Sequence, residues 1–109
     1  MIGRIWHGWA AREDADAYED MLNSDVLPGI HRIKGYRGAY VMRREVGDEV
    51  EFMTMTIFED IAAVKQFAGE DYTKAVMQGP AQKLLKRADL RSTHYEILMT
   101  PDTAPRGEP

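Results

Sequence analysis

The sequence predicts an α+β domain of the ferredoxin-like type, a four-stranded antiparallel sheet with helices on one face. Segments rich in β-branched and aromatic residues alternate with helical segments in the order β-α-β-β-α-β. The run from Phe52 to Phe58 is apolar or Thr on both parities, which indicates a strand that is covered on both faces. A chain of 109 residues has room for one hydrophobic core, so we expect a single domain.

The N-terminal third predicts a strand followed by a helix. Met1–Trp9 is rich in β-formers, and strand alternation places Trp6 and Trp9 on opposite faces. Arg12–Leu27 has acidic residues in its first turns and apolar residues at spacings of three and four, as in a helix packed on a core. Pro28-Gly29 is expected to end or kink this helix near Leu27.

The middle of the chain predicts a hairpin that leads into a second helix. Tyr36–Val46 and Glu49–Phe58 flank the turn residues Gly47-Asp48, which is typical of a β-hairpin. The helix Ile61–Ala68 follows, with Asp60 as its N-cap and Gly69 as its C-cap.

The C-terminal third predicts shorter elements. We expect a helical continuation at Asp71–Met77, a short helix at Ala81–Ala88 and the fourth strand at Leu90–Met99. The last ten residues, 100–109, contain three prolines and no bulky apolar side chain. We therefore expect a domain over residues 1–99 and a disordered tail.

Composition narrows the range of partners. The net charge is −4 and the basic residues are dispersed, so neither nucleic acid nor a membrane surface is an expected partner. No apolar stretch approaches the length of a membrane span or resembles a signal peptide, which favours a cytoplasmic protein. The chain has no Cys, and its three His lack the spacing of a metal site.

The face of the sheet away from the helices is expected to bind a second copy of the chain. Large side chains on the second and fourth strands would otherwise remain exposed, and pairing of two sheets about a two-fold axis covers them. The prediction is a homodimer that associates through its sheet faces, on the basis of Tyr36, Tyr40, Met42, Tyr95, Ile97 and Met99.

Four segments together resemble the antibiotic biosynthesis monooxygenase family over roughly residues 1–99. They are MIGRIWHGW, the hairpin YRGAYVMRRE–GDEVEFMTMTIFED, the helix end FAGEDY and the closing strand HYEIL. The resemblance implies a dimeric α+β barrel. Characterised members of that family include cofactor-independent oxygenases that oxidise polycyclic aromatic substrates such as anthrones, and others bind or degrade haem, while many members have no established activity.

The haem-degrading branch differs from this chain at three positions where that branch carries functional side chains. That branch has a Trp where this sequence has Phe67, a His ligand near Val76 or Met77, and an Asn roughly where His7 stands. Haem binding is therefore a third option, and no cofactor is expected. The anthrone-oxidising branch uses Asn, Trp and Tyr side chains, for which the nearest residues here are Trp6, Trp9 and Tyr72, whereas the single Asn of the chain, Asn23, lies in the first helix.

His7 and His94 are the candidate bases, because imidazole titrates near neutral pH and the two residues could share a face if their strands are neighbours. The competing interpretation is a half-buried structural His. Tyr72 could direct its hydroxyl into a pocket or serve as a core aromatic. Aromatic side chains could line a site for a flat apolar ligand or simply pack the core, and these are Trp6, Trp9, Phe52, Phe58 and Phe67.

Two functions follow from the sequence. The first is a cofactor-independent monooxygenase that acts on an aromatic or polyketide-like small molecule. The alternative is a non-catalytic dimeric module that binds a small apolar ligand or has a stress-related role.

Overall fold

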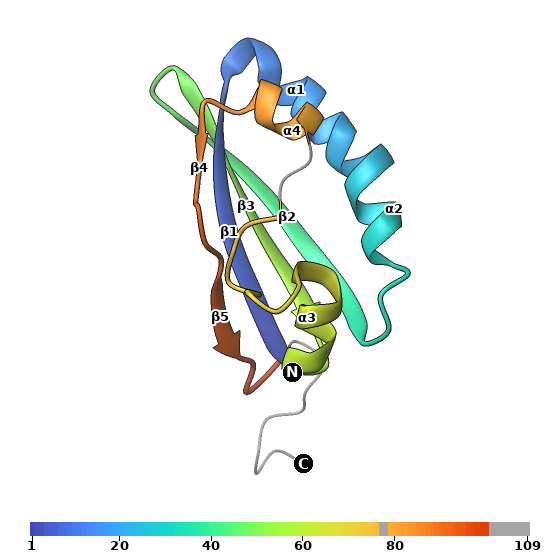
Figure 1. The fold of residues 1–109 in the computed structure, drawn as a ribbon. Helices are drawn as coiled ribbons and strands as arrows, with labels where there is room; N and C mark the ends of the chain where they lie inside the picture. The colour runs from blue at the N-terminus through green and yellow to red at the C-terminus, as the bar shows by residue number, and fades with distance from the viewer. Residues whose placement is uncertain (77–78, 101–109) are drawn as a thin grey trace.

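A computed structural model describes residues 1–76 and 79–100 and has one antiparallel sheet with helices along one face (Figure 1). Strands β2, β3 and β1 lie side by side in that order, and β4 and β5 pair in turn with the outer edge of β1. This confirms the α+β ferredoxin-like prediction, with five strands where four were expected. The strands are β1 (Ile2–Ala11), β2 (Tyr36–Val46), β3 (Glu49–Phe58), β4 (Arg87–Ala88) and β5 (Thr93–Glu96).

The helical elements are short, and each packs through a few apolar side chains. They are α1 (Arg12–Met21), the π-helical turn η1 (Leu22–Val26), α2 (Leu27–Ile30), α3 (Ile61–Ala68) and α4 (Gly79–Leu84). Figure 1 shows α1 and α2 forming one rod across the sheet, with α3 near one end of that rod and α4 near the other. None of the described helices is long and apolar enough to cross a membrane.

The hairpin and the helix after it form as their local chemistry predicts. Gly47 adopts φ 62° in the two-residue turn, and β2 and β3 pair from Val46–Glu49 to Tyr36–Phe58, with a bulge near Gly38. The Asp60 carboxylate accepts a hydrogen bond from the Ala63 amide at 2.9 Å and so caps α3. Gly69, at φ 87°, ends that helix in a conformation that favours glycine.

The first helical segment runs past its predicted end, so Pro28 does not terminate it at Leu27. The rod continues to Ile30, because η1 widens before the proline. The Leu27 amide donates to the carbonyl of Leu22, five residues earlier, as in a π-helix. Pro28 occupies the first turn of α2, where a missing amide costs little.

The C-terminal predictions are wrong in detail. Residues 71–76 are turns and extended chain rather than a helix, while Met77 lies outside the described residues, as do residues 101–109 of the expected tail. The helix expected at Ala81–Ala88 is α4 followed by β4, and the strand expected at Leu90–Met99 contracts to β5. Pairing with β1 decides these changes, since the Asp89 amide donates to the His7 carbonyl at 2.9 Å.

The two faces of the sheet differ in what covers them. Even-numbered side chains of β1 and β3 point toward the helices, and Trp6, Val50, Phe52 and Phe58 are buried there. The opposite face carries no helix. We call it the open face, and its large apolar side chains include Tyr40, Met42 and Tyr95, each about half exposed. The core is therefore one-sided in a single chain.

Candidate functional site

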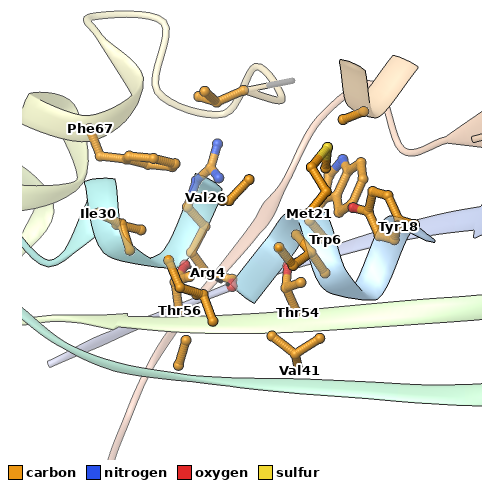
Figure 2. A pocket seen from close by; sticks show the side chains of 15 residues that line it. Arg4, Trp6, Tyr18, Met21, Val26, Ile30, Val41, Thr54, Thr56 and Phe67 are labelled. Atoms are coloured by element: carbon orange, nitrogen blue, oxygen red, sulfur yellow. Dashed lines mark hydrogen bonds between the residues drawn. The ribbon is translucent and has the colours of Figure 1, made fainter. Parts of the chain in front are cut away.

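A cavity of about 80 Å³ lies between the helical rod and the sheet (Figure 2). Leu22, Val26 and Leu27 of the rod form one wall, and Val41, Thr54 and Thr56 of the sheet form the other. Most of its lining is apolar, which suits a flat hydrophobic ligand. The remaining lining residues are Arg4, Trp6, Tyr18, Met21, Ile30, Ala39, Phe67, Val76 and Ala81.

Arg4 is the one charged side chain among the described lining residues, and only 5% of it is exposed. Its Nη2 donates to the backbone carbonyls of Tyr72 at 3.4 Å and Lys74 at 3.0 Å. Its Nε has no partner in the described part of the chain. The guanidinium carbon lies 5.3 Å from the ring centre of Phe67, and Figure 2 shows the side chain rising from β1 beside that ring. Burial lowers the pKa of Arg4 to about 10, so the group is charged at neutral pH.

His94 and Tyr72 form a second group beside Arg4. His94 pairs with Arg4 across β5 and β1, on the helix side of the sheet, and its ring packs edge-on against Tyr72 with the ring centres 5.1 Å apart. Burial and, secondarily, the positive charge of Arg4 lower the pKa of His94. The buried Nε2 of His94 has no partner within the described residues. Neither ring lines the cavity at its present size.

His7 lies on the open face, whereas His94 lies on the helix side of the sheet. The two residues are on neighbouring strands, as expected, but their rings do not share a face. The His7 Nδ1 lies 2.8 Å from Oδ2 of Asp89, and the His7 backbone N–H donates a hydrogen bond to the same oxygen at 3.0 Å. Trp9 is on this face too, with its ring centre 6.0 Å from that of His7, and Arg87 lies over the Trp9 ring. These residues form a polar group apart from the cavity.

The predicted aromatic lining divides into three sets. Trp6 and Phe67 line the cavity, and the Trp6 indole N–H donates to the Asp89 carbonyl at 2.8 Å. Phe52 and Phe58 are fully buried in the two core clusters on either side of it. Trp9 is on the other face. With Tyr18, which the sequence did not single out, the cavity aromatics come from β1, α1 and α3.

Sequence reasoning missed Arg4 and Asp89. Arg4 reads as a polar interruption in an apolar strand, yet its even parity, shared with Trp6, is a signal that it faces the helices. Asp89 was assigned to no site, because its contact with His7 depends on the pairing of β4 with β1. Neither contact could be predicted from local spacing.

The described residues around the cavity do not form a ligand set for a metal ion or for haem. The described part of the chain contains no group of three or more His, Cys, Asp or Glu that could hold a metal ion. Haem iron is usually held by His, Cys, Met or Tyr. No His is among the described lining residues, and the sulfur of Met21 and the hydroxyl of Tyr18 belong to buried core residues.

The chain belongs to the antibiotic biosynthesis monooxygenase family, whose profile matches residues 1–79. No curated protein matches the sequence. A proposed antibiotic biosynthesis monooxygenase of Bacillus cereus is similar in fold, with a TM-score of 0.67, 13% identity and coverage of 96% of this chain and 98% of that one.

Two further neighbours represent different chemistries on this fold. SnoaB of Streptomyces nogalater, a cofactor-independent oxygenase, has a TM-score of 0.64 and 8% identity over 94% of this chain and 98% of its own. MhuD of Mycobacterium tuberculosis, a haem degrader, has a TM-score of 0.59 and 14% identity over 92% of this chain and 98% of its own. At these identities the likeness concerns the fold, so the activity has to be argued from the site.

Proposed function

We propose that this protein is a cofactor-independent monooxygenase that oxidises an aromatic, polyketide-like small molecule in the cavity between rod and sheet. The observation that carries the proposal is a mostly apolar cavity that contains a buried cation, together with an imidazole beside that cation whose Nε2 has no hydrogen-bond partner among the described residues. Oxidation of a ring CH₂ to C=O by O₂ releases one water molecule. The substrate supplies all four electrons, so the reaction needs no external reductant.

His94 is the base that we assign to proton removal. The pKa of His94 is lowered, so the ring is neutral at pH 7. Its Nε2 has no hydrogen-bond partner among the described residues and can accept the proton of the substrate. Tyr72 orients the imidazole by its edge-on contact, and Trp6 forms a wall against which a flat substrate packs. His94 does not line the cavity in its present form. The cavity therefore has to widen past Arg4 for the substrate to reach the His94 ring.

The cavity has to enlarge before a polycyclic substrate fits. Ligand pockets generally measure about 300–1,000 Å³, against 80 Å³ here. The π-helical turn η1 supplies Leu22 and Val26 to the wall, and π-helical segments are frequent at functional sites. Outward movement of the rod at η1 is therefore the opening that we propose.

Oxygen consumption with dithranol, a dihydroxyanthrone, tests the activity against the uncatalysed background. We expect uptake above background and a loss of about a hundredfold in His94→Gln, the usual contribution of a general base. His31→Gln, at an exposed position, is the matched control. Absence of enzymatic uptake would refute the oxygenase proposal, and a loss confined to His7→Gln would move the base to the open face.

A non-catalytic ligand-binding module is the second candidate function, favoured by the small volume of the cavity and the absence of a His from its described lining. Ligand binding without oxygen consumption would establish it. A Soret shift on haem titration would instead support the haem option.

We further propose a homodimer formed through the open faces. These faces carry half-exposed Tyr40, Met42 and Tyr95, and a hollow of about 690 Å³ beside Met55 and Ile57. Sedimentation is expected to report a dimer for the native chain and a monomer for Met42→Glu, since a buried unpaired carboxylate opposes association. Glu45→Gln, on the other face of β2, serves as the control, and a Met42→Glu dimer would contradict the proposal.

A further inference from the structure

Arg4 has an unbalanced charge within the described part of the chain. Buried arginines are normally paired with an acid, but no carboxylate among the described residues lies within ion-pair distance of Arg4, and its partners are the two carbonyls. The arginines that do form ion pairs lie at the surface, beside Asp or Glu. They are Arg12, Arg37, Arg43, Arg44, Arg87 and Arg91.

The hydrogen-bonding capacity of the guanidinium is only partly used. Only Nη2 makes hydrogen bonds to described residues, while Nε is buried and unpartnered. Two other buried polar atoms lack partners within the described chain, Nε2 of His94 and Oγ of Ser92, and His94 pairs directly with Arg4. Orphaned donors and acceptors of this kind need an explanation, and an absent ligand provides one.

The surroundings of Arg4 specify the rest of such a ligand. The Phe67 ring lies against the guanidinium, and the other walls are chiefly apolar. A ligand that satisfies both requirements has an aromatic body and an anionic oxygen. Carboxylates and ionised ring hydroxyls share that chemistry, and both accept hydrogen bonds from a guanidinium.

We propose that the ligand of this cavity is an aromatic molecule with an anionic oxygen, and that Arg4 binds this oxygen. The inference rests on the proposed function for the aromatic character of the substrate. In the oxygenase, loss of the acidic proton leaves its electron pair on the substrate as an enolate or phenolate. Arg4 then stabilises the charge that develops on oxygen in a site of low polarity.

The test compares ligands of one shape and different charge. Binding of benzoate and benzamide is measured by calorimetry for the native protein, Arg4→Met, Arg4→Lys and the surface control Arg43→Met. We expect benzoate to bind about tenfold more tightly than benzamide in the native chain and in Arg43→Met. The ratio should fall to about one in Arg4→Met, with benzamide binding retained, and should be partly restored in Arg4→Lys.

A second arm identifies the form of anionic oxygen. The absorbance of 4-nitrophenol reports its ionisation, and binding near Arg4 should shift that ionisation to lower pH in the native protein but not in Arg4→Met. A shift together with the benzoate preference establishes recognition of both forms, and either result alone restricts the ligand to that form. Equal binding of benzoate and benzamide with no shift, or a benzoate preference retained in Arg4→Met, overturns the inference.

These measurements need no turnover, so the two proposals fail separately. Arg4-dependent anion binding without oxygen uptake refutes the oxygenase and leaves the ligand class intact. Oxygen uptake that is unchanged in Arg4→Met refutes the role assigned to Arg4 and leaves the oxygenase proposal intact.

Discussion

Replacement of Arg4 by Met is expected to stabilise the folded protein while removing the group that we propose binds an anionic oxygen. Burial lowers the pKa of Arg4 from 12.5 to about 10. At about 1.4 kcal/mol per pKa unit, the fold disfavours the charged guanidinium by about 3 kcal/mol relative to the unfolded chain. Met fills most of the space of the aliphatic stem and carries no charge.

Lost contacts oppose this gain. Arg4→Met removes the hydrogen bonds to the carbonyls of Tyr72 and Lys74, at about 1 kcal/mol each. The net expectation is a stabilisation of about 1 kcal/mol. For a domain of this size that corresponds to a rise of about 4–8 °C in Tm.

Thermal and urea unfolding followed by circular dichroism measure the difference at pH 7. Arg4→Ala, which leaves a void, is the comparison variant and should be less stable than Arg4→Met. Above pH 10 the folded native chain releases the Arg4 proton before the unfolded chain does, so its stability should rise relative to Arg4→Met. A Tm for Arg4→Met several degrees below that of the native protein would refute the argument that this charge is held at a cost.

Two further predictions concern stability. Asp60→Ala should lower the free energy of unfolding by about 1 kcal/mol in urea titrations, because the Ala63 amide loses its cap, whereas Asp60→Asn should retain most of it; equal losses in the two variants would contradict the capping role. Because the folded state holds the pKa of His94 below its usual value, protonation favours the unfolded chain, and stability should fall as the pH drops below about 6.5. His94→Gln should reduce the difference between urea midpoints at pH 7 and pH 5, and an undiminished difference would exclude His94 as its source.

The features predicted correctly from the sequence depend on neighbouring residues. The bounds of β2, β3 and α3 agree with the predicted ranges, because a Gly turn, an Asp cap and a Gly stop act over a few residues. Their chemistry is complete within each segment. Local rules therefore sufficed for the hairpin and the helix after it.

The failures share a non-local cause. The short elements after Gly69 are determined by contacts with β1, such as the hydrogen bonds from Arg4 to the Lys74 carbonyl and from the Asp89 amide to His7. Alternation within one strand assigned Trp6 and Trp9 to opposite faces. The relative placement of His7 and His94, however, required the register between two strands, which no spacing within the sequence specifies.

The alternation of β1 separates two kinds of chemistry within a few residues. Arg4 and Trp6 face the cavity, whereas His7 and Trp9 face the surface proposed to bind a second chain. Each face has its own polar partners, since Asp89 holds the His7 ring while the carbonyls of Tyr72 and Lys74 hold Arg4. We therefore expect the proposed ligand recognition and the proposed assembly to be altered independently, by substitutions at even and odd positions of β1. A single-residue slip in the pairing of β1 with β3 would exchange the two faces and abolish both, so we expect this register to be essential to either function.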